Sequence, residues 1–566
     1  MLKHALLLAG LPLFMLGCTT PGIVSGGDYS SDDAALFADF LAGTYASRVD
    51  DFDARTDYYA RAFERAPTDI FIGRRALTFA VLEGDMELAR ELASDMLRTD
   101  GEEPMARLIL GQAAFRADRH RDAGAYFAPD TQDFTMGIAM DIEAAWNAEA
   151  AGDRAGARAQ LETIAGGDPF RTLGRLGLAV LDARDGKVDE ALAHLDAVDE
   201  TGLYPTESAL TRARILSGAG RLEEARDFLV DFNGDNGDFD TGPVQNAIDR
   251  LTAGRALVSD LSPRAQAARL LTEPSYSFFV RNRALDAAEL YLRLALDLDP
   301  DHSKAKVWLG NILEGSDRNA DALALYRSIS DDDDFLVSAR LAEANVLFDE
   351  DRDAEALDVL EAVNDLKPSV VTREALGRAR LIRENYEEAL PIYDALVESL
   401  TEEELKANPQ PLYFRGISHE RTDNFDAAVA DFRRVLSYTP DDADTLNYLG
   451  YSWADRGENL QEAFEMIERA VELEPDSGAI TDSLGWAHYK LGRYQEARKH
   501  LERAAELSPG SATIIDHLGD VYWRLGRYRE AGYQWRRALT LGPTDEEREA
   551  IDRKLEGGLD AANASP

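Results

Sequence analysis

Cysteine is almost absent from this chain, which has a single one, Cys18, among 566 residues. One cysteine cannot form an intramolecular disulfide, and it excludes zinc sites built from several cysteines. Histidine is also scarce, with eight residues, and no pair has the HExxH spacing of a helix-borne zinc site. Positive charge is in deficit, with 61 Lys and Arg against 105 Asp and Glu, a net charge of −44. Such a chain repels phosphate backbones, so we expect no nucleic-acid partner.

Motifs of common catalytic and nucleotide-binding sites are missing as well. There is no GxxxxGK phosphate loop, and "GRLGLA" (174–179) falls within a helical pattern and not after a strand. "GYSWA" (450–454) lacks the second glycine of a nucleophile elbow. In the acidic loop 231–242, Asn236 and Gly242 stand where a calcium-binding EF-hand needs Gly and Glu, although a looser calcium contact stays open. We therefore predict no enzymatic activity, no cofactor, no metal site and no small-molecule substrate.

The N-terminus has the pattern of a bacterial secretion signal. Lys3 and His4 precede a 12-residue apolar run that is too short to cross a bilayer as a helix. Met15-Leu16-Gly17-Cys18 resembles a lipobox, although Met15 and Leu16 depart from the usual residues. The resemblance implies that residues 1–17 are removed and that Cys18 is acylated. An ordinary signal peptide followed by an incidental cysteine is the alternative.

A lipid on Cys18 predicts a cell-envelope protein. Several acyl chains give stable membrane anchoring. The next residue is Thr19 and not the Asp that resembles an inner-membrane retention signal, so we expect the periplasmic face of the outer membrane. Residues 18–34 are rich in Gly, Ser, Thr and Asp, which is typical of a flexible tether.

A regular spacing runs along the chain from residue 35. "LGRYQEA" (491–497) and "LGRYREA" (525–531) are separated by one such period, which is about 34 residues long. In the N-terminal half, markers recur with the same period from Gly43 to Ala213. The apolar pattern between markers is helical and is interrupted by Gly, Asp or Pro. With Gly519 as a marker in the C-terminal half, the equivalent positions upstream are Gly485, Gly450, Gly416, Gly377, Ala344, Gly310 and Tyr276.

Each period has the residues of a helix-turn-helix repeat. Leu518 and Tyr522 lie on one face of a first helix, and Gly526 ends it. Small Ala531 then lies where helices cross, and Trp535 continues the apolar stripe of a second helix. This pattern resembles the tetratricopeptide repeat, most closely over 441–475, 476–509 and 510–543. The resemblance implies an all-α fold, a right-handed α-solenoid that binds proteins.

The spacing also predicts the domain organisation. The interval between Ala213 and Tyr276 is almost twice the usual period, which indicates a junction between two solenoids, and "TEEELKANPQP" (401–411) lengthens one repeat as a surface insertion. An enzyme hidden between 214 and 275 stays an alternative. We predict a signal peptide at 1–17, a tether at 18–34, an N-terminal solenoid at 35–236, an irregular junction at 237–275, a C-terminal solenoid with a capping helix at 276–556, and a disordered tail at 557–566.

Partner recognition must use residues that the repeat does not need for packing. First helices line the concave side of such a solenoid, so we predict partner-binding residues at free positions on them. Trp and Arg are frequent in protein interfaces, and aspartates in these positions argue against a clamp for a terminal carboxylate and favour a basic partner. The candidates are Tyr413, Arg421, Asn447, Tyr451, Asp482, Trp486, Lys490, Asp516, Asp520, Trp523 and Arg524.

The stretch 447–497, with its expansion near "RGENLQEA" and the following "DSLGW", resembles a family of large bacterial tetratricopeptide lipoproteins. The characterised member of that family binds a periplasmic carboxyl-terminal processing protease and presents cell-wall hydrolases to it. The resemblance implies a lipid-anchored scaffold or adaptor with a protease and hydrolases as partners. The alternative is an assembly factor or pilotin-like component of an outer-membrane or secretion complex.

Overall fold

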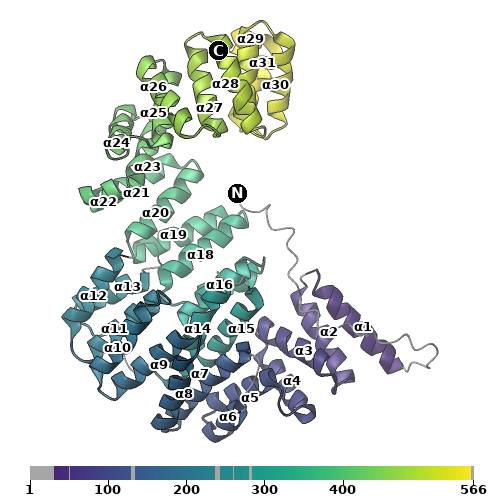
Figure 1. Cartoon of the computed structure of the whole chain (residues 1–566). Helices are drawn as coiled ribbons and strands as arrows, with labels where there is room; N and C mark the ends of the chain where they lie inside the picture. Colours follow the sequence, from purple (N-terminus) through teal and green to yellow (C-terminus); the bar gives the residue numbers. More distant parts are fainter. Residues whose placement is uncertain are drawn as a thin grey trace. The chain divides into compact units, whose positions relative to one another are not determined.

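The computed structural model describes residues 31–49, 51–128, 134–235, 242–258, 261–279 and 284–562. Within these ranges the chain forms 31 α-helices and no β-strand (Figure 1), which confirms the predicted all-α fold. The signal peptide 1–17, Cys18, most of the predicted tether and residues 563–566 lie outside the described residues. Helix α1 (Ser31–Ala46) includes the last residues, 31–34, of the segment that we predict to be a tether.

The chain divides into two compact units, residues 1–339 and 340–566, called unit 1 and unit 2 below. Helix α18 (Leu336–Asp349) contains the boundary. The other helices of unit 1 are α2 (Phe52–Arg65), α3 (Ile70–Glu83), α4 (Met86–Thr99), α5 (Pro104–Arg116), α6 (His120–Phe127), α7 (Phe134–Ala150), α8 (Arg154–Gly166), α9 (Arg171–Arg184), α10 (Val188–Asp199), α11 (Pro205–Gly218), α12 (Leu222–Asp235), α13 (Gly242–Thr252), α14 (Pro263–Ser277), α15 (Leu285–Leu298), α16 (Ser303–Glu314) and α17 (Asn319–Arg327). Those of unit 2 are α19 (Asp353–Leu366), α20 (Val370–Ile382), α21 (Tyr386–Ser399), α22 (Glu402–Ala407), α23 (Gln410–Arg421), α24 (Phe425–Tyr438), α25 (Ala443–Arg456), α26 (Leu460–Leu473), α27 (Gly478–Lys490), α28 (Tyr494–Leu507), α29 (Ala512–Arg524), α30 (Tyr528–Leu539) and α31 (Asp545–Ala562).

The turn between the two helices of a repeat has a left-handed backbone residue at a constant place. Gly526, with φ of 75°, is the example that the sequence predicts, and it ends α29 where a Cβ would be unfavourable. In degenerate repeats an acidic residue takes this place, such as Asp423 with φ of 61°. The equivalent positions are Gly84, Asp118, Gly152, Gly186, Gly220, Gly254, Asp317, Asp351, Glu384, Gly457 and Gly492.

Glycine in the first helix packs against a large side chain of the second. A Cβ on Gly519 would lie 2.5 Å from the ring of Trp535, and one on Gly310 would lie within 2.3 Å of Tyr326. Trp535 is only 1% exposed, so it fills the space that the absent side chain leaves. This contact explains why small and aromatic residues alternate along each repeat.

The predicted junction at 237–275 is more regular than its composition indicates. Ala247 follows the marker Ala213 by one full repeat period, and Gly254 follows the turn residue Gly220 by the same interval. Ala247 is buried in α13, which therefore occupies the place of another first helix. Residues 263–277 then form α14, which pairs with α15. Helix α13 is thus an extra first helix that no second helix of a repeat follows, and it explains the long interval between Ala213 and Tyr276. In unit 2, the predicted insertion 401–411 holds the short helix α22, which Thr401 caps.

Unit 1 is not an open solenoid, because α14 and α15 lie against its first helices. Helix α14 packs on α7 and α9, and α15 packs on α3 (Figure 1). Gln112 of α5 donates from Nε2 to the carbonyl of Leu294 in α15 at 3.0 Å. Arg116 of α5 also donates to Asp297 of α15, at 2.5 Å. Apolar residues are buried around most of α15, which is expected of a helix covered on two sides.

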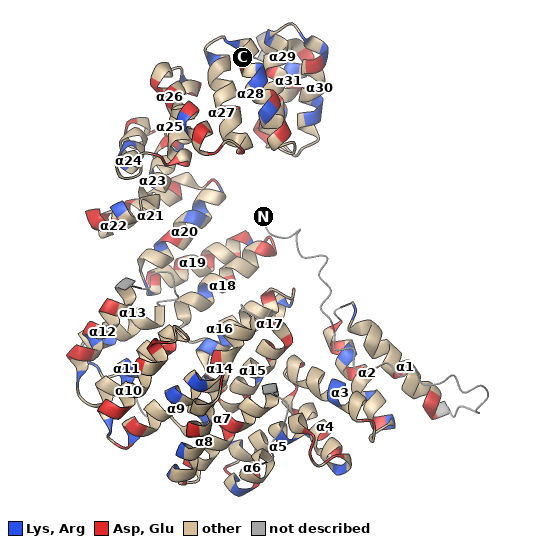
Figure 2. Ribbon diagram, viewed as in Figure 1, with Lys and Arg blue, Asp and Glu red and all other residues tan. Residues whose placement is uncertain are grey.

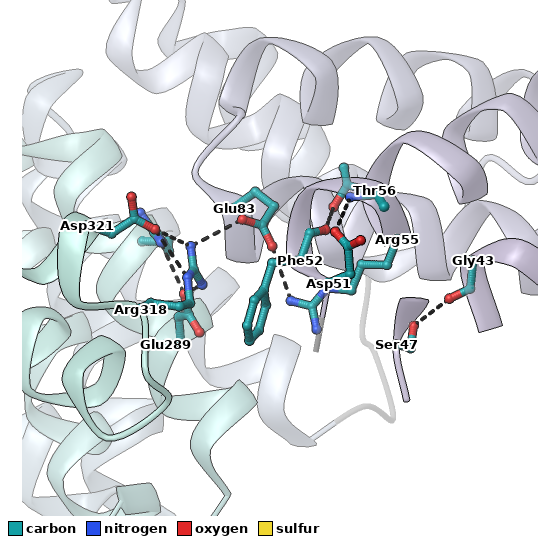
Figure 3. Close-up of polar contacts among 12 residues, drawn as sticks. Gly43, Ser47, Asp51, Phe52, Arg55, Thr56, Glu83, Glu289, Arg318 and Asp321 are labelled. Carbon is teal, nitrogen blue, oxygen red and sulfur yellow. Dashed lines mark hydrogen bonds and ion pairs between the residues drawn. The ribbon is translucent and has the colours of Figure 1, made fainter. Parts of the chain in front are cut away.

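A buried ion-pair cluster adds to this closure (Figure 3). Arg318, just before α17, donates to Glu83 of α3 at 3.2 Å and to Glu289 of α15 at 3.0 Å. Arg55 of α2 reaches the same Glu83 at 3.2 Å. Burial raises the pKa of Glu83, although Arg318 and Arg55 act in the opposite direction. The cluster thus joins the first repeats of unit 1 to its last ones.

Helix α31 covers the end of unit 2, where the sequence predicts a capping helix. Its Ile551 and Leu559 are 0% and 3% exposed and belong to the same apolar core as Trp535 of α30. Helix α31 packs on both α29 and α30. The last repeat therefore has its apolar end shielded by a helix that is polar on its outer side.

Candidate functional site

The predicted partner-binding residues all lie on first helices of unit 2, on α23, α25, α27 and α29, or at their ends. We call this surface the first-helix face. Three of the eleven residues, Arg421, Lys490 and Arg524, are exposed. Asp482 and Asp520 are buried, and the other six are half-buried.

Trp486 is the centre of an aromatic stack on this face. Its ring lies parallel to that of Tyr489, with centroids 4.6 Å apart, and close to that of His517, at 4.1 Å. The indole Nε1 donates to Asp455 at 3.2 Å, and Lys490 forms an ion pair with the same carboxylate at 2.9 Å. The two neighbouring rings fix the orientation of Trp486, and because this residue is only half-buried, part of its indole is accessible to a partner.

The aspartates on this face have partners within unit 2. Asp482 accepts a hydrogen bond from His517 at 2.9 Å. Asp516 and Asp520 accept from Lys554 of α31 at 2.6 and 2.9 Å. These contacts correct the expectation that the aspartates are available to a basic partner. The sequence places them on the correct helices, but it does not show that neighbouring helices supply the cations.

The titration of these groups reflects their burial. Burial, followed by the nearby charge of Asp516, raises the pKa of Asp520 to about 6. Burial would by itself lower the pKa of His517, but the carboxylate of Asp482 outweighs it and raises that pKa. The contact with Asp482 therefore favours the protonated form of His517, whose ring stacks on that of Trp486.

The other predicted residues are only partly brought together. Trp523 packs against Trp535, with centroids 5.4 Å apart, and lies under the α31 residue Gly558. Arg524 donates to the hydroxyl of Tyr489 at 3.2 Å, so it borders the aromatic stack. Tyr413, Arg421, Asn447 and Tyr451 lie on α23 and α25, where Arg421 contacts the ring of Tyr386 at 5.1 Å and Tyr413 packs edge-on against Tyr448 at 6.1 Å.

A second candidate site, which the sequence does not predict, is a cavity of about 960 Å³ inside unit 1. Helices α11, α13, α14 and α16 and the loop 330–335 line it. Acidic and basic side chains are interspersed along the helices of this unit (Figure 2). The cavity gathers cations from four of them, Arg214 of α11, Arg269 of α14, Lys304 of α16 and Arg250 of α13, which pairs with Asp334. No local spacing links these residues, so only the fold shows that they meet.

Two buried carboxylates lie among these cations. Glu207 pairs with Arg269, and its other oxygen is 3.8 Å from Lys304. Burial would raise the pKa of Glu207, but Arg269, Lys304 and Arg214 together lower it to about 2. Glu273 pairs with Lys304, yet burial raises its pKa to about 7. Burial also lowers the pKa of Arg214, to about 9.

The repeats match a known family. The tetratricopeptide-repeat model matches residues 142–208, 276–336, 415–479, 456–512 and 483–546, and a second model of that repeat matches 207–230. The paired helices and the recurring left-handed turn define an α-solenoid of helix-turn-helix repeats. Together with the family matches, they make this chain a tetratricopeptide-repeat protein, which confirms the predicted fold class.

Similar proteins share this repeat. Over 188 residues, 33% of its length, the chain is 30% identical to the TPR repeat-containing protein PA4667 of Pseudomonas aeruginosa, and it spans only 31% of that relative. Among solved structures it is similar to the hetero-tetramer Cut9-Hcn1 of the APC/C, at 15% identity over 94% of this chain and 97% of that one, with a TM-score of 0.36. It is also similar to YrrB, a TPR protein with an unusual peptide-binding site, at 18% identity over 30% and 86%, with a TM-score of 0.25.

Two kinds of site are not found in the described ranges. Among these residues, no group of three or more His, Cys, Asp or Glu is arranged to hold a metal ion. None of the helices described is both long and apolar enough to span a bilayer.

Proposed function

We propose that this protein is a non-enzymatic scaffold that holds a protein partner on the first-helix face of unit 2. Tetratricopeptide repeats are protein-interaction modules, and the repeat matches cover this face from residue 415 onward. The observation that carries the proposal is the half-exposed stack of Trp486 on Tyr489 and His517. Lys490, which pairs with Asp455, and Arg524 are exposed beside it, so the face offers an aromatic surface bordered by charged side chains.

The location that we propose is the periplasmic face of the outer membrane, with a lipid on Cys18 as the anchor. The lipobox-like sequence before Cys18 supports this location. Anchoring would confine the scaffold to a surface and raise the effective concentration of whatever it holds. The resemblance of 447–497 to protease-binding lipoproteins supports a periplasmic processing protease and its cell-wall hydrolase substrates as partners.

Recovery of partners from solubilised envelopes tests the proposal. The tagged full chain is expected to recover a protease and cell-wall hydrolases, and Trp486→Ala is expected to reduce their yield. Lys490→Met, which removes a cation from the same face together with its exposed pair with Asp455, is expected to act in the same direction with only a small change in melting temperature. The matched control is Tyr533→Ala, since Tyr533 is 63% exposed on a second helix, α30. Equal recovery by all three variants would contradict the proposal.

The assembly-factor alternative gives a different result in the same experiment. Recovery of only outer-membrane barrel or secretin subunits would favour it and reject the protease scaffold. The anchor has its own test, because Cys18→Ser is expected to release the protein into the soluble periplasm. Persistent membrane association of that variant would reject the lipid.

A further inference from the structure

We propose that the cavity of unit 1 binds one carboxylate group carried on an apolar body. This ligand site is separate from the first-helix face, and it does not depend on the scaffold function proposed above. The inference rests on three properties of the cavity, namely its charge balance, its polar atoms without partners and its aromatic wall.

The charged side chains around Arg214 include one cation more than carboxylates, because Arg250, which also lines the cavity, is paired with Asp334. Arg269 and Lys304 pair with Glu207 and Glu273. Arg214 also faces this group, but among the described residues it forms no ion pair or hydrogen bond, and its Nη1 is buried. Glu207 and Asp334 attract Arg214 without bonding to it directly, and a buried cation that lacks a direct partner is still unfavourable. A single anion beside Arg214 would restore the balance.

Two further polar atoms at the cavity lack partners. The Nε2 atom of His302 and the hydroxyl of Ser275 are buried, and neither has a hydrogen-bond partner within the described ranges. Burial lowers the pKa of His302 to about 3, so its ring is neutral. A neutral imidazole and a hydroxyl can each donate one hydrogen bond to a carboxylate oxygen. Three buried groups in the lining of this one cavity, from α11, α14 and the residue before α16, can therefore each bond to an anion within it.

The rest of the lining includes an aromatic part and an acidic part. The rings of Tyr276 and Trp308 lie 5.7 Å apart, and Tyr276 is 48% exposed. Aromatic surface of this kind suits an apolar ligand body. A second negative charge on the ligand would be repelled, because five aspartates also line the cavity, namely Asp299, Asp301, Asp332, Asp333 and Asp334. These aspartates argue against phosphates, nucleotides and polyacidic segments.

Ligand titration of the purified full chain tests this class. We expect 4-phenylbutyrate to bind saturably by calorimetry and to raise the melting temperature. Its uncharged amide, 4-phenylbutyramide, and the dianion phenyl phosphate are expected to do neither. Equal effects of the acid and the amide would overturn the proposal, as would the absence of saturable binding of any monocarboxylate tested.

Arg214→Met separates a binding role from a structural one. Because Arg214 has no partner among the described residues, we expect this variant to melt at or above the temperature of the wild type. Binding of 4-phenylbutyrate is expected to fall about tenfold or more, since a hydrogen-bonded charge is lost. The matched control Arg269→Met is expected to melt lower, because it leaves Glu207 buried and unpaired. A lower melting temperature of Arg214→Met would assign Arg214 to the fold and overturn the site.

Two further experiments extend the test. Ser275→Ala is expected to weaken binding several-fold while the protein stays folded, and unchanged binding would overturn the role of the buried hydroxyl. The source of the carboxylate is separated by comparing the free acid with the blocked peptide acetyl-Phe-Glu-Phe-amide. Tighter binding of the peptide would indicate a segment of a protein, and tighter binding of the acid would indicate a free small molecule. Binding of neither would reject the site.

Discussion

Arg318 donates from Nη2 to Oε2 of Glu83 at 3.2 Å, although 235 residues separate them in the sequence. The arginine side chain is 7% exposed, and the carboxylate is 13% exposed. Nη1 of the same guanidinium donates to Glu289 of α15. One planar donor thus holds α3 and α15 together at the point where unit 1 closes, a geometry that a lysine could not reproduce.

Arg318→Met is expected to lower the free energy of unfolding by about 2 to 3 kcal/mol. This is somewhat less than the loss expected when a buried charge is left with no partner at all. The loss is moderated because Arg55 still pairs with Glu83 and Arg293 with Glu289. Thermal and urea unfolding of the full chain measure it. The control is Arg352→Met, whose exposed pairs with Glu350 and Glu355 are expected to leave stability unchanged. An Arg318→Met protein with the same free energy of unfolding as the wild type would show that the cluster does not stabilise unit 1.

Gly519→Ala is expected to destabilise the last repeat by about 1 to 3 kcal/mol through overpacking. The new methyl group would lie 2.5 Å from the ring of Trp535, which has no room to move because it is buried. Melting curves test this, with Gly510→Ala as the control, since nothing lies within 4 Å of a Cβ there. The double variant Gly519→Ala/Trp535→Leu is expected to recover part of the loss, and failure to recover would argue against the clash.

The His517–Asp482 pair is expected to make unit 2 more stable at acidic than at alkaline pH. The pKa of His517 in the folded protein is raised above its ordinary value of 6.5. Its stabilising contribution is therefore complete below about pH 6.5 and is lost as the pH rises through the folded pKa. The melting difference between wild type and His517→Asn is expected to be larger at about pH 5.5 than at about pH 8.5. A difference that grows with pH would reverse the sign and contradict the pairing. His419→Asn serves as the control, because His419 forms no ion pair with a described residue.

Lys554→Met is expected to cost about 3 kcal/mol at neutral pH, because Asp516 and Asp520 would lose their cation. With a pKa of about 6, Asp520 is largely protonated at lower pH, so the loss is expected to shrink toward pH 5. Unfolding at both pH values measures the effect. The neighbouring Arg553→Met, whose side chain is 56% exposed, is expected to change little at either pH. If the loss of unfolding free energy in Lys554→Met were the same at both pH values, Lys554 would not stabilise the protein through Asp516 and Asp520.

Local rules predict much of this fold from the sequence. Gly526 and its equivalents need a left-handed backbone, and Gly519 must leave space for Trp535, so the repeat is visible as a period. The same rules extend to Ala247 and Gly254, but their loop-like surroundings conceal α13 in the sequence. The capping helix is predictable because an end repeat must cover its apolar side.

Contacts between distant residues explain what the sequence does not predict. In the sequence, Asp482 has the position of a partner-binding residue. Only the packing of α27 on α29 shows that its carboxylate is already bonded to His517. Arg214, Arg269 and Lys304 come from three helices and share no spacing, so their cavity is a property of the tertiary structure. The sequence places Trp486 on a first helix, but it does not show that His517 of α29 stacks on its ring or that Asp455 of α25 accepts its hydrogen bond.

The placement of α14 and α15 against α3, α7 and α9 has a consequence for how unit 1 folds. In an ordinary repeat array each repeat contacts only its neighbours, so the array can nucleate anywhere and lose a terminal repeat with little effect. Unit 1 must instead close a loop of 235 residues to form the contact between Glu83 and Arg318. Such a high contact order predicts slow, all-or-none folding. Removing α2 and α3 would therefore destabilise helices as far along the chain as α17.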